Sequence, residues 1–282
     1  MSDKIPFPFR EISKHKRDKS FEQLCNYDEK ELKLSWKYNL CSDYYFQEYR
    51  LETKKGKWSN VEVWNDPNER KKVFAVLKKH GIEETPDSIR RIIKLWYGCV
   101  NQFRPDVAVY IYRKYKPRCI LDFSAGWGDR AIAAMSQGID YIGIDSNKSL
   151  KVPYNKMIKD LSKIKNSNIT MIFDYSENVD FSKFKYDLVF TSPPYFSIEK
   201  YKDMKDYSKE SFIDDFFKIV IKNVWKHLQK GGTMALNMPK EMEEIVETVI
   251  VYKKKESIKM PIQNRNYTSN VKNHEYIYCW TK

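Results

Sequence analysis

The sequence predicts an α/β fold with a mostly parallel, doubly wound sheet and a mainly helical N-terminal extension. From about residue 103, short apolar runs alternate with helical stretches, which is the pattern of a parallel α/β sheet. A glycine-containing turn follows the first of these runs, as in open sheets that bind ligands at their carboxyl edge. Residues 1 to about 100 mix charged and aromatic residues without such alternation. We therefore expect an N-terminal accessory region at 1–100 and an α/β domain at 101–282.

The elements of the α/β domain are expected in a regular order. Candidate strands lie at 118–124, 141–146, 169–174, 186–192 and 233–238, and a terminal pair lies at 246–252 and 275–282. Candidate helices lie at 104–116, 129–138, 149–164 and 208–232. The first helix opens with Arg-Pro, a favourable start, and the second ends at Gly138, a favourable stop.

Composition and charge indicate a globular protein that meets polyanions. The 282 residues are 41% hydrophobic, which is enough for a sizeable core. With 51 Lys and Arg against 38 Asp and Glu, the formal net charge of +13 favours nucleic acid as a partner. A membrane surface is the weaker partner because no basic amphipathic segment is evident. The basic residues are spread along the chain, so a Lys-rich solvated surface remains an alternative.

The cysteines and the N-terminus point to a reducing compartment. The five cysteines are far apart, odd in number and show no C-x-x-C spacing, which argues against a disulfide framework and against a Cys-based zinc site. No metal site is predicted. The N-terminus has no apolar stretch of signal-peptide length, and no segment approaches the ~20 apolar residues of a membrane span. We expect an intracellular, cytoplasmic protein, or a nuclear one in a eukaryotic host.

A glycine turn marks the expected ligand edge of the sheet. In LDFSAGWGDR, residues 121–130, Gly126 and Gly128 allow close approach of a ligand and backbone angles closed to other residues. The motif lacks the third glycine of the dinucleotide fingerprint and the Lys-Ser/Thr of a phosphate-binding P-loop. A diphosphate cofactor is therefore disfavoured.

Acidic residues stand at the ends of three consecutive candidate strands. They are Asp122, Asp145 and Asp174. Asp145 follows the glycine turn by some 20 residues, where a carboxylate accepts hydrogen bonds from ribose hydroxyls, and Asp174 is placed to accept from an adenine amino group. For each of the three, a turn or helix-capping role is the alternative.

The fourth strand leads into TSPPYF, residues 191–196. Proline fixes the backbone and removes N–H donors, so the Ser192 hydroxyl and the carbonyls of Ser192 and Pro193 present acceptors outward. Acceptors in a rigid pocket suit a neutral –NH₂ group whose lone pair must face an electrophile. Tyr195 offers a flat face for a planar ring. A simple proline turn after a strand is the alternative.

Taken together, TSPPY and LDFSAGWG resemble the S-adenosylmethionine-dependent amino-methyltransferases of nucleic acids, over about residues 101–282. The resemblance implies a Rossmann-like methyltransferase sheet with an antiparallel final strand and S-adenosylmethionine as the cofactor. It implies that the target amine is held by Ser192, Pro193, Pro194 and Tyr195. It assigns the cofactor to Phe103, Asp122, Ser124, Gly126, Gly128, Asp145 and Asp174. Trp127 departs from the family's usual Ser or Thr, so the detailed lining of the pocket stays open.

The implied reaction is direct methyl transfer to a base rotated out of its stack. DNA is the expected substrate, with cytosine N4 slightly favoured over adenine N6 because Ser in the first motif position is associated with cytosine enzymes. An RNA amino-methyltransferase, a protein-glutamine methyltransferase and a decayed nucleic-acid-binding subunit remain alternatives. The expected reader of the polymer is the N-terminal hundred residues, whose mixed aromatic and cationic side chains include Tyr44, Tyr45, Arg50, Trp58 and Trp64.

Overall fold

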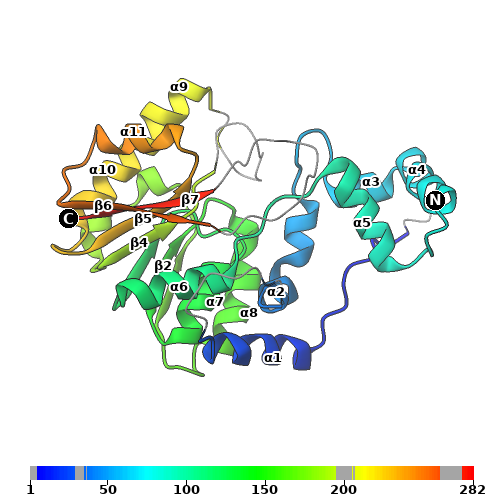
Figure 1. Cartoon of the computed structure of the whole chain (residues 1–282), viewed down its shortest axis with the longest axis horizontal. Coiled ribbons are helices and arrows are strands. Elements are labelled where there is room, and N and C mark those ends of the chain that lie inside the picture. The colour runs from blue at the N-terminus through cyan, green and yellow to red at the C-terminus, as the bar shows by residue number, and fades with distance from the viewer. Residues whose placement is uncertain (1–4, 29–34, 36, 195–204, 206, 261–274) are drawn as a thin grey trace.

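The computed structural model describes residues 5–28, 35, 37–194, 205, 207–260 and 275–282 (Figure 1). In this part of the chain the strands form one seven-stranded sheet in the order β3-β2-β1-β4-β5-β7-β6. The strands are β1 Cys119–Asp122, β2 Asp140–Ile144, β3 Ile169–Ile172, β4 Leu188–Thr191, β5 Thr233–Met238, β6 Lys254–Lys259 and β7 Tyr276–Thr281. The first five are mutually parallel, and β7 is antiparallel to both β5 and β6. The predicted Rossmann-like methyltransferase fold, with its antiparallel final strand, is confirmed.

Helices cover both faces of the sheet because alternate residues of each strand point to opposite sides. In β1, Ile120 packs into one core cluster and Leu121 into the other. The first face is covered by α6 Pro105–Tyr115, α7 Asp129–Gln137 and α8 Lys151–Leu161. The second is covered by the π-helix η4 Phe212–Phe217, α10 Lys218–His227 and α11 Glu241–Glu247. The central strands are therefore enclosed, which explains their mostly apolar sequence.

The sixth strand differs from the expectation. The sequence pattern predicts a strand at 246–252, but Glu241–Glu247 form helix α11, and β6 lies at Lys254–Lys259. Met242 and Val246, four residues apart, share the buried side of α11, so this apolar pattern has a helical period. The strand itself, KKESIK, is exposed at alternate positions, as expected of a charged edge strand. Because strand β6 is polar, a pattern of apolar runs does not predict it.

The N-terminal hundred residues are mainly helical and pack as two groups. Their helices are α1 Lys14–Cys25, α2 Asn39–Glu52, α3 Asn60–Asn65, α4 Pro67–Lys79 and α5 Pro86–Tyr97. Helices α1 and α2 contribute Leu24 and Phe46 to the core on the first face of the sheet. Helices α3 to α5 build a separate small core with Phe7, and they project beyond α2 in Figure 1. The boundary at residue 100 remains a prediction.

Helix starts in this region follow from local sequence. Ser59 and Glu62 form a capping box at the start of α3, and Thr85 and Ser88 form one at the start of α5, where proline occupies the first turn. At the start of α4 the Asp66 side chain accepts from the N–H groups of Asn68 and Glu69. Over the described ranges, no helix is long and apolar enough to pass through a lipid bilayer.

Candidate active site

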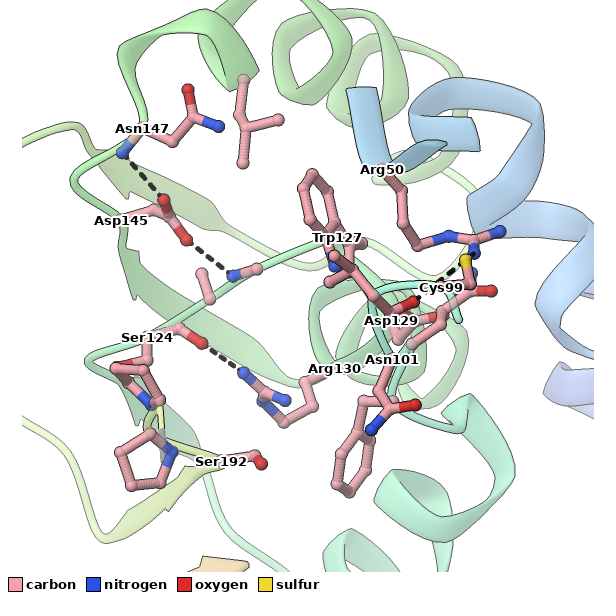
Figure 2. A pocket seen from close by; sticks show the side chains of 18 of the residues that line it. Arg50, Cys99, Asn101, Ser124, Trp127, Asp129, Arg130, Asp145, Asn147 and Ser192 are labelled. Carbon is pink, nitrogen blue, oxygen red and sulfur yellow. Dashed lines mark hydrogen bonds between the residues drawn. The ribbon is translucent and has the colours of Figure 1, made fainter. Parts of the chain in front are cut away.

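A cavity of about 830 Å³ opens at the carboxyl ends of the parallel strands. Its walls come from the loops after β1, β2, β3 and β4, and from helices α2 and α5 of the N-terminal region. Figure 2 shows Ser124, Asp145 and Ser192, from the loops after β1, β2 and β4, on the side of this space away from Arg50 of α2. One cavity thus joins the predicted cofactor loop, the predicted target motif and the N-terminal helices.

The loop after β1 is tied to the end of β2 at Asp145. The backbone N–H of Gly126 donates to Asp145 Oδ2 at 2.7 Å, and that of Asn147 donates to Oδ1 at 2.9 Å (Figure 2). Gly126 has φ +60°, and a Cβ built there would meet only the Ser124 carbonyl oxygen, at 3.9 Å. The space above Gly126 is therefore open to a ligand, and the Asp145 carboxylate is fixed beside it.

Burial raises the pKa of Asp145 to about 6, against the lowering effect of the two backbone N–H groups that it accepts. The carboxyl is therefore mostly ionised at neutral pH. Both oxygens keep lone pairs for a further donor, because a carboxylate accepts about four hydrogen bonds and two are made here.

Asp122 lies under the loop, not in the cavity wall. Its side chain is fully buried and accepts from Arg130 Nε at 2.6 Å, the Tyr141 hydroxyl at 2.5 Å and the Ser124 N–H at 3.2 Å. Arg130 in turn donates to the Ser124 carbonyl (Figure 2). Asp122 thus anchors the loop through Arg130, and its direct contact with the cofactor remains a prediction.

Gly128 also lies outside the cavity wall. Its φ is +76°, and a Cβ there would stand 2.6 Å from Phe46 Cε2 and 3.1 Å from Met157 Sδ. Glycine is required because α2 and α8 pack directly on the backbone at the start of α7. The structure shows a packing role for Gly128, and its predicted role at the cofactor remains a prediction.

Asp174 is exposed and serves the turn after β3. Its carboxylate accepts from the N–H of Tyr175 at 2.7 Å and from Asn178 Nδ2 at 3.3 Å. The residues that line the cavity here are Tyr175 and Ser176, and the Ser176 hydroxyl donates to the Phe123 carbonyl at 2.6 Å. Asp174 thus accepts the hydrogen bonds of the turn, and the next residue, Tyr175, begins the part of the chain that lines the cavity.

The target motif lines the cavity at its described residues Ser192, Pro193 and Pro194, whereas Tyr195 lies outside the described part of the chain. The Ser192 hydroxyl donates to Asn237 Oδ1 at 3.3 Å, and Asn237 Nδ2 donates to the Tyr276 carbonyl at 3.2 Å. Asn237, from β5, also lines the cavity and was not predicted. The feature of the sequence that could have indicated Asn237 is a polar side chain within the otherwise largely apolar strand TMALNM.

Helix α2 is fastened to the start of α7, directly after the loop that follows β1, by a buried polar network. Asn39 Nδ2 donates to the Phe103 carbonyl at 2.8 Å and to Asp129 Oδ1 at 3.1 Å, and the Ser42 hydroxyl donates to the same oxygen at 2.5 Å. Burial raises the pKa of Asp129 to about 8, so this carboxyl is mostly protonated at neutral pH. Phe103 lines the cavity, and its ring lies 5.0 Å from the Arg130 guanidinium carbon.

The predicted site residues divide clearly by position. Those that line the cavity are Phe103, Ser124, Gly126, Asp145, Ser192, Pro193 and Pro194. Asp122 and Gly128 support the loop from below, and Asp174 faces solvent. In the described residues there is no group of three or more His, Cys, Asp or Glu side chains that would hold a metal ion.

No family model matches this sequence. A curated relative, the release factor glutamine methyltransferase of Fusobacterium nucleatum, is 28% identical over 160 residues, which cover 49% of this chain and 43% of the relative. The chain therefore spans less than half the length of that protein.

Several solved methyltransferases have a similar sheet. TrmN from Thermus thermophilus is 14% identical with a TM-score of 0.45, over 63% of this chain and 48% of that chain. The tRNA (m1A58) methyltransferase TrmI from Aquifex aeolicus is 14% identical with a TM-score of 0.42, over 64% and 70%. A precorrin-6y C5,15-methyltransferase from Geobacter metallireducens is 14% identical with a TM-score of 0.42, over 63% and 88%. Similarity at this level gives no indication of a shared substrate.

Proposed function

We propose that this protein is an S-adenosylmethionine-dependent methyltransferase that acts on the –NH₂ group of a nucleic acid base. The observation that carries the proposal is the shared cavity: the acceptor rim Ser192-Pro193-Pro194 and the Gly126–Asp145 pair line the same space in a methyltransferase-type sheet. The curated relative, itself named as a methyltransferase, supports the reaction class.

The cavity fits the cofactor S-adenosylmethionine. Asp145 is held with free lone pairs where ribose hydroxyls need an acceptor, and Gly126 leaves room above the loop. Phe103, on the segment before α6, would lie at the methionine end. When bound, this cofactor supplies a methyl group on a positively charged sulfur.

The chain's own residues would orient the target nitrogen. The Ser192 hydroxyl donates its proton to Asn237, and we assign its oxygen the role of acceptor for an N–H of the substrate amine. The Asn237 amide is itself oriented by its bond to the Tyr276 carbonyl. Acceptors fixed in this way also stabilise the positive charge that develops on the nitrogen as it forms its new bond.

The net charge of +13 supports a polyanionic substrate. The sequence-based preference for DNA gains no support, because the curated relative is named for a protein release factor. We therefore place RNA and DNA on an equal footing. Methylation of a protein glutamine amide is the second candidate, favoured by the same relative, since an amide also presents a planar –NH₂ group.

Radiolabelled cofactor incubated with the enzyme and DNA, RNA or cell protein tests the proposal. Methylated cytosine or adenine, identified by nucleoside mass spectrometry, is the expected product. Label confined to protein glutamine would replace the proposal by the second candidate. Cofactor binding without transfer to any of the three polymers would refute both and indicate a binding subunit.

Cofactor affinity should depend on pH through Asp145. Since its pKa is raised to about 6, the ionised form that accepts ribose hydroxyls is lost as the pH falls through that value. The dissociation constant for S-adenosylmethionine should rise about tenfold per pH unit below 6 and stay flat from 7 to 8. Calorimetric titration measures it. In Asp145→Asn the affinity should be weak and independent of pH, and a pH slope retained in that variant would assign the titration to another group.

Asn237 should act through Ser192. In Asn237→Ala the hydroxyl loses its oriented acceptor, and kcat should fall about tenfold, with unchanged cofactor affinity. Asn237→Asp retains an acceptor oxygen and should recover part of kcat. If both variants lose activity only in proportion to a loss of thermal stability, Asn237 has a structural role alone.

A further inference from the structure

The N-terminal helices add a cationic wall to the cavity. Between them, the N-terminal stretch and α2 and α5 bring five basic side chains to its lining, Arg10, Arg50, Arg90, Arg91 and Lys94. They bring two acidic ones, Asp43 and Asp87. This wall therefore brings three more basic than acidic side chains to the cavity that the target motif also lines.

Two of the five cations are engaged by the two carboxylates. Arg50 is paired with Asp43 at 2.5 Å, and both side chains are about nine-tenths buried. Arg90 is paired with Asp87 and also donates to the Pro8 carbonyl. These pairs have a structural purpose, since each fixes a helix or the N-terminal stretch.

Arg10 and Arg91 do not form structural ion pairs of this kind. Both are exposed, and within the described ranges neither guanidinium group has a carboxylate partner or donates a hydrogen bond. The backbone at Arg10 is nevertheless held in place: its N–H donates to Gln47 Oε1 at 2.8 Å, and Gln47 Nε2 donates to its carbonyl at 2.9 Å. Two guanidinium groups are thus presented to solvent at fixed points of the cavity wall.

The positions of the buried residues of α5 explain why Arg91 lies on the side of the helix that lines the cavity. Ile89, Ile92 and Ile93 form the buried side of the helix, and Arg91 and Lys94 lie three residues apart on the opposite, exposed side. That exposed side is the one that lines the cavity. Figure 1 shows α5 in the N-terminal group that lies beyond α2, at a distance from the outer strands β6 and β7.

We propose that Arg10 and Arg91 bind phosphates of the strand that carries the target base. The inference rests on the proposed function and adds to it the location of the substrate backbone. With a base at Ser192, its flanking phosphates leave the cavity past this wall, where guanidinium groups make two-pronged contacts with phosphate oxygens. Such contacts position the strand without reading its sequence.

A charge-reversal pair tests this assignment. Arg10→Glu/Arg91→Glu is compared with Lys222→Glu/Lys226→Glu, which changes the net charge equally at exposed positions of α10 outside the cavity. The probe is a fluorescent single-stranded 20-mer of mixed sequence, as DNA and as RNA. In 0.1 M salt the cavity pair should weaken binding on the order of tenfold. It should also reduce the slope of log affinity against log salt by about 1.4, since each phosphate that is no longer neutralised removes about 0.7.

Cofactor affinity should remain that of the wild type in both double variants, which shows that they are folded. If the α10 pair weakens binding as much as the cavity pair, or if the salt slope is unchanged, the assignment is wrong while methyl transfer stands. If the wild-type protein binds cofactor but neither oligonucleotide, both the assignment and the nucleic acid substrate are refuted. A difference between the DNA and RNA probes identifies the preferred strand.

Discussion

Ser192→Ala should reduce kcat by about 100-fold or more and leave the dissociation constant of S-adenosylmethionine within about twofold of the wild type. The hydroxyl lies on the target side of the cavity, where it donates to Asn237 and is the proposed acceptor for the substrate amine. Alanine removes that acceptor without filling the pocket or touching the Gly126–Asp145 pair. Single-turnover methyl transfer and calorimetric cofactor binding measure the two effects separately.

Ser182→Ala is the matched control, because Ser182 is an exposed serine that does not line the cavity. It should behave as the wild type in both assays. Adding Tyr195→Ala to Ser192→Ala should abolish transfer with little further change in cofactor affinity. A parallel loss of cofactor affinity and activity in Ser192→Ala would place this residue at the cofactor instead and would remove the basis of the proposed mechanism.

The sheet could be predicted because its strands are defined locally. The runs around Ile120, Ile142 and Val189 are apolar at nearly every position, as burial on both faces requires, and glycine punctuates the turns. The end of the sheet was harder, because β6 at 254–259 is a polar edge strand whose partner is β7. Residues 254–259 form a strand because they pair with β7 along its whole length, and β7 is distant in the sequence.

The site could be predicted in position but not in the role of each residue. Asp122 and Asp145 both stand at the end of a strand, but the first lies buried under the loop and the second borders the cavity. Which way each carboxylate turns depends on Arg130, eight residues from Asp122, and on the N–H of Gly126, nineteen residues from Asp145. A pattern of acidic residues at strand ends does not show which other segments these residues will contact. The same holds for Asn39, whose bond to Phe103 spans 64 positions.

Asp122→Asn should destabilise the protein more than any other single change at this edge of the sheet. Asp122 is fully buried, and its carboxylate is the ion-pair partner of Arg130, which is also buried. Removing one partner of a buried pair leaves an uncompensated charge, which costs about 3–5 kcal/mol. For a domain of this size the melting temperature should fall by roughly 6–20 °C. Thermal unfolding without cofactor measures it.

The contrast with the other two strand-end carboxylates makes the assignment specific. Asp174→Asn, at an exposed turn, should change neither melting temperature nor cofactor affinity appreciably, whereas Asp145→Asn should weaken the cofactor with a small change in stability. Asp122→Asn should lose affinity only as far as the loop held by Arg130 loosens, so saturating cofactor should restore part of the lost stability. Wild-type stability together with lost cofactor binding in Asp122→Asn would instead mean that this carboxylate contacts the cofactor directly, as its place in the sequence suggested.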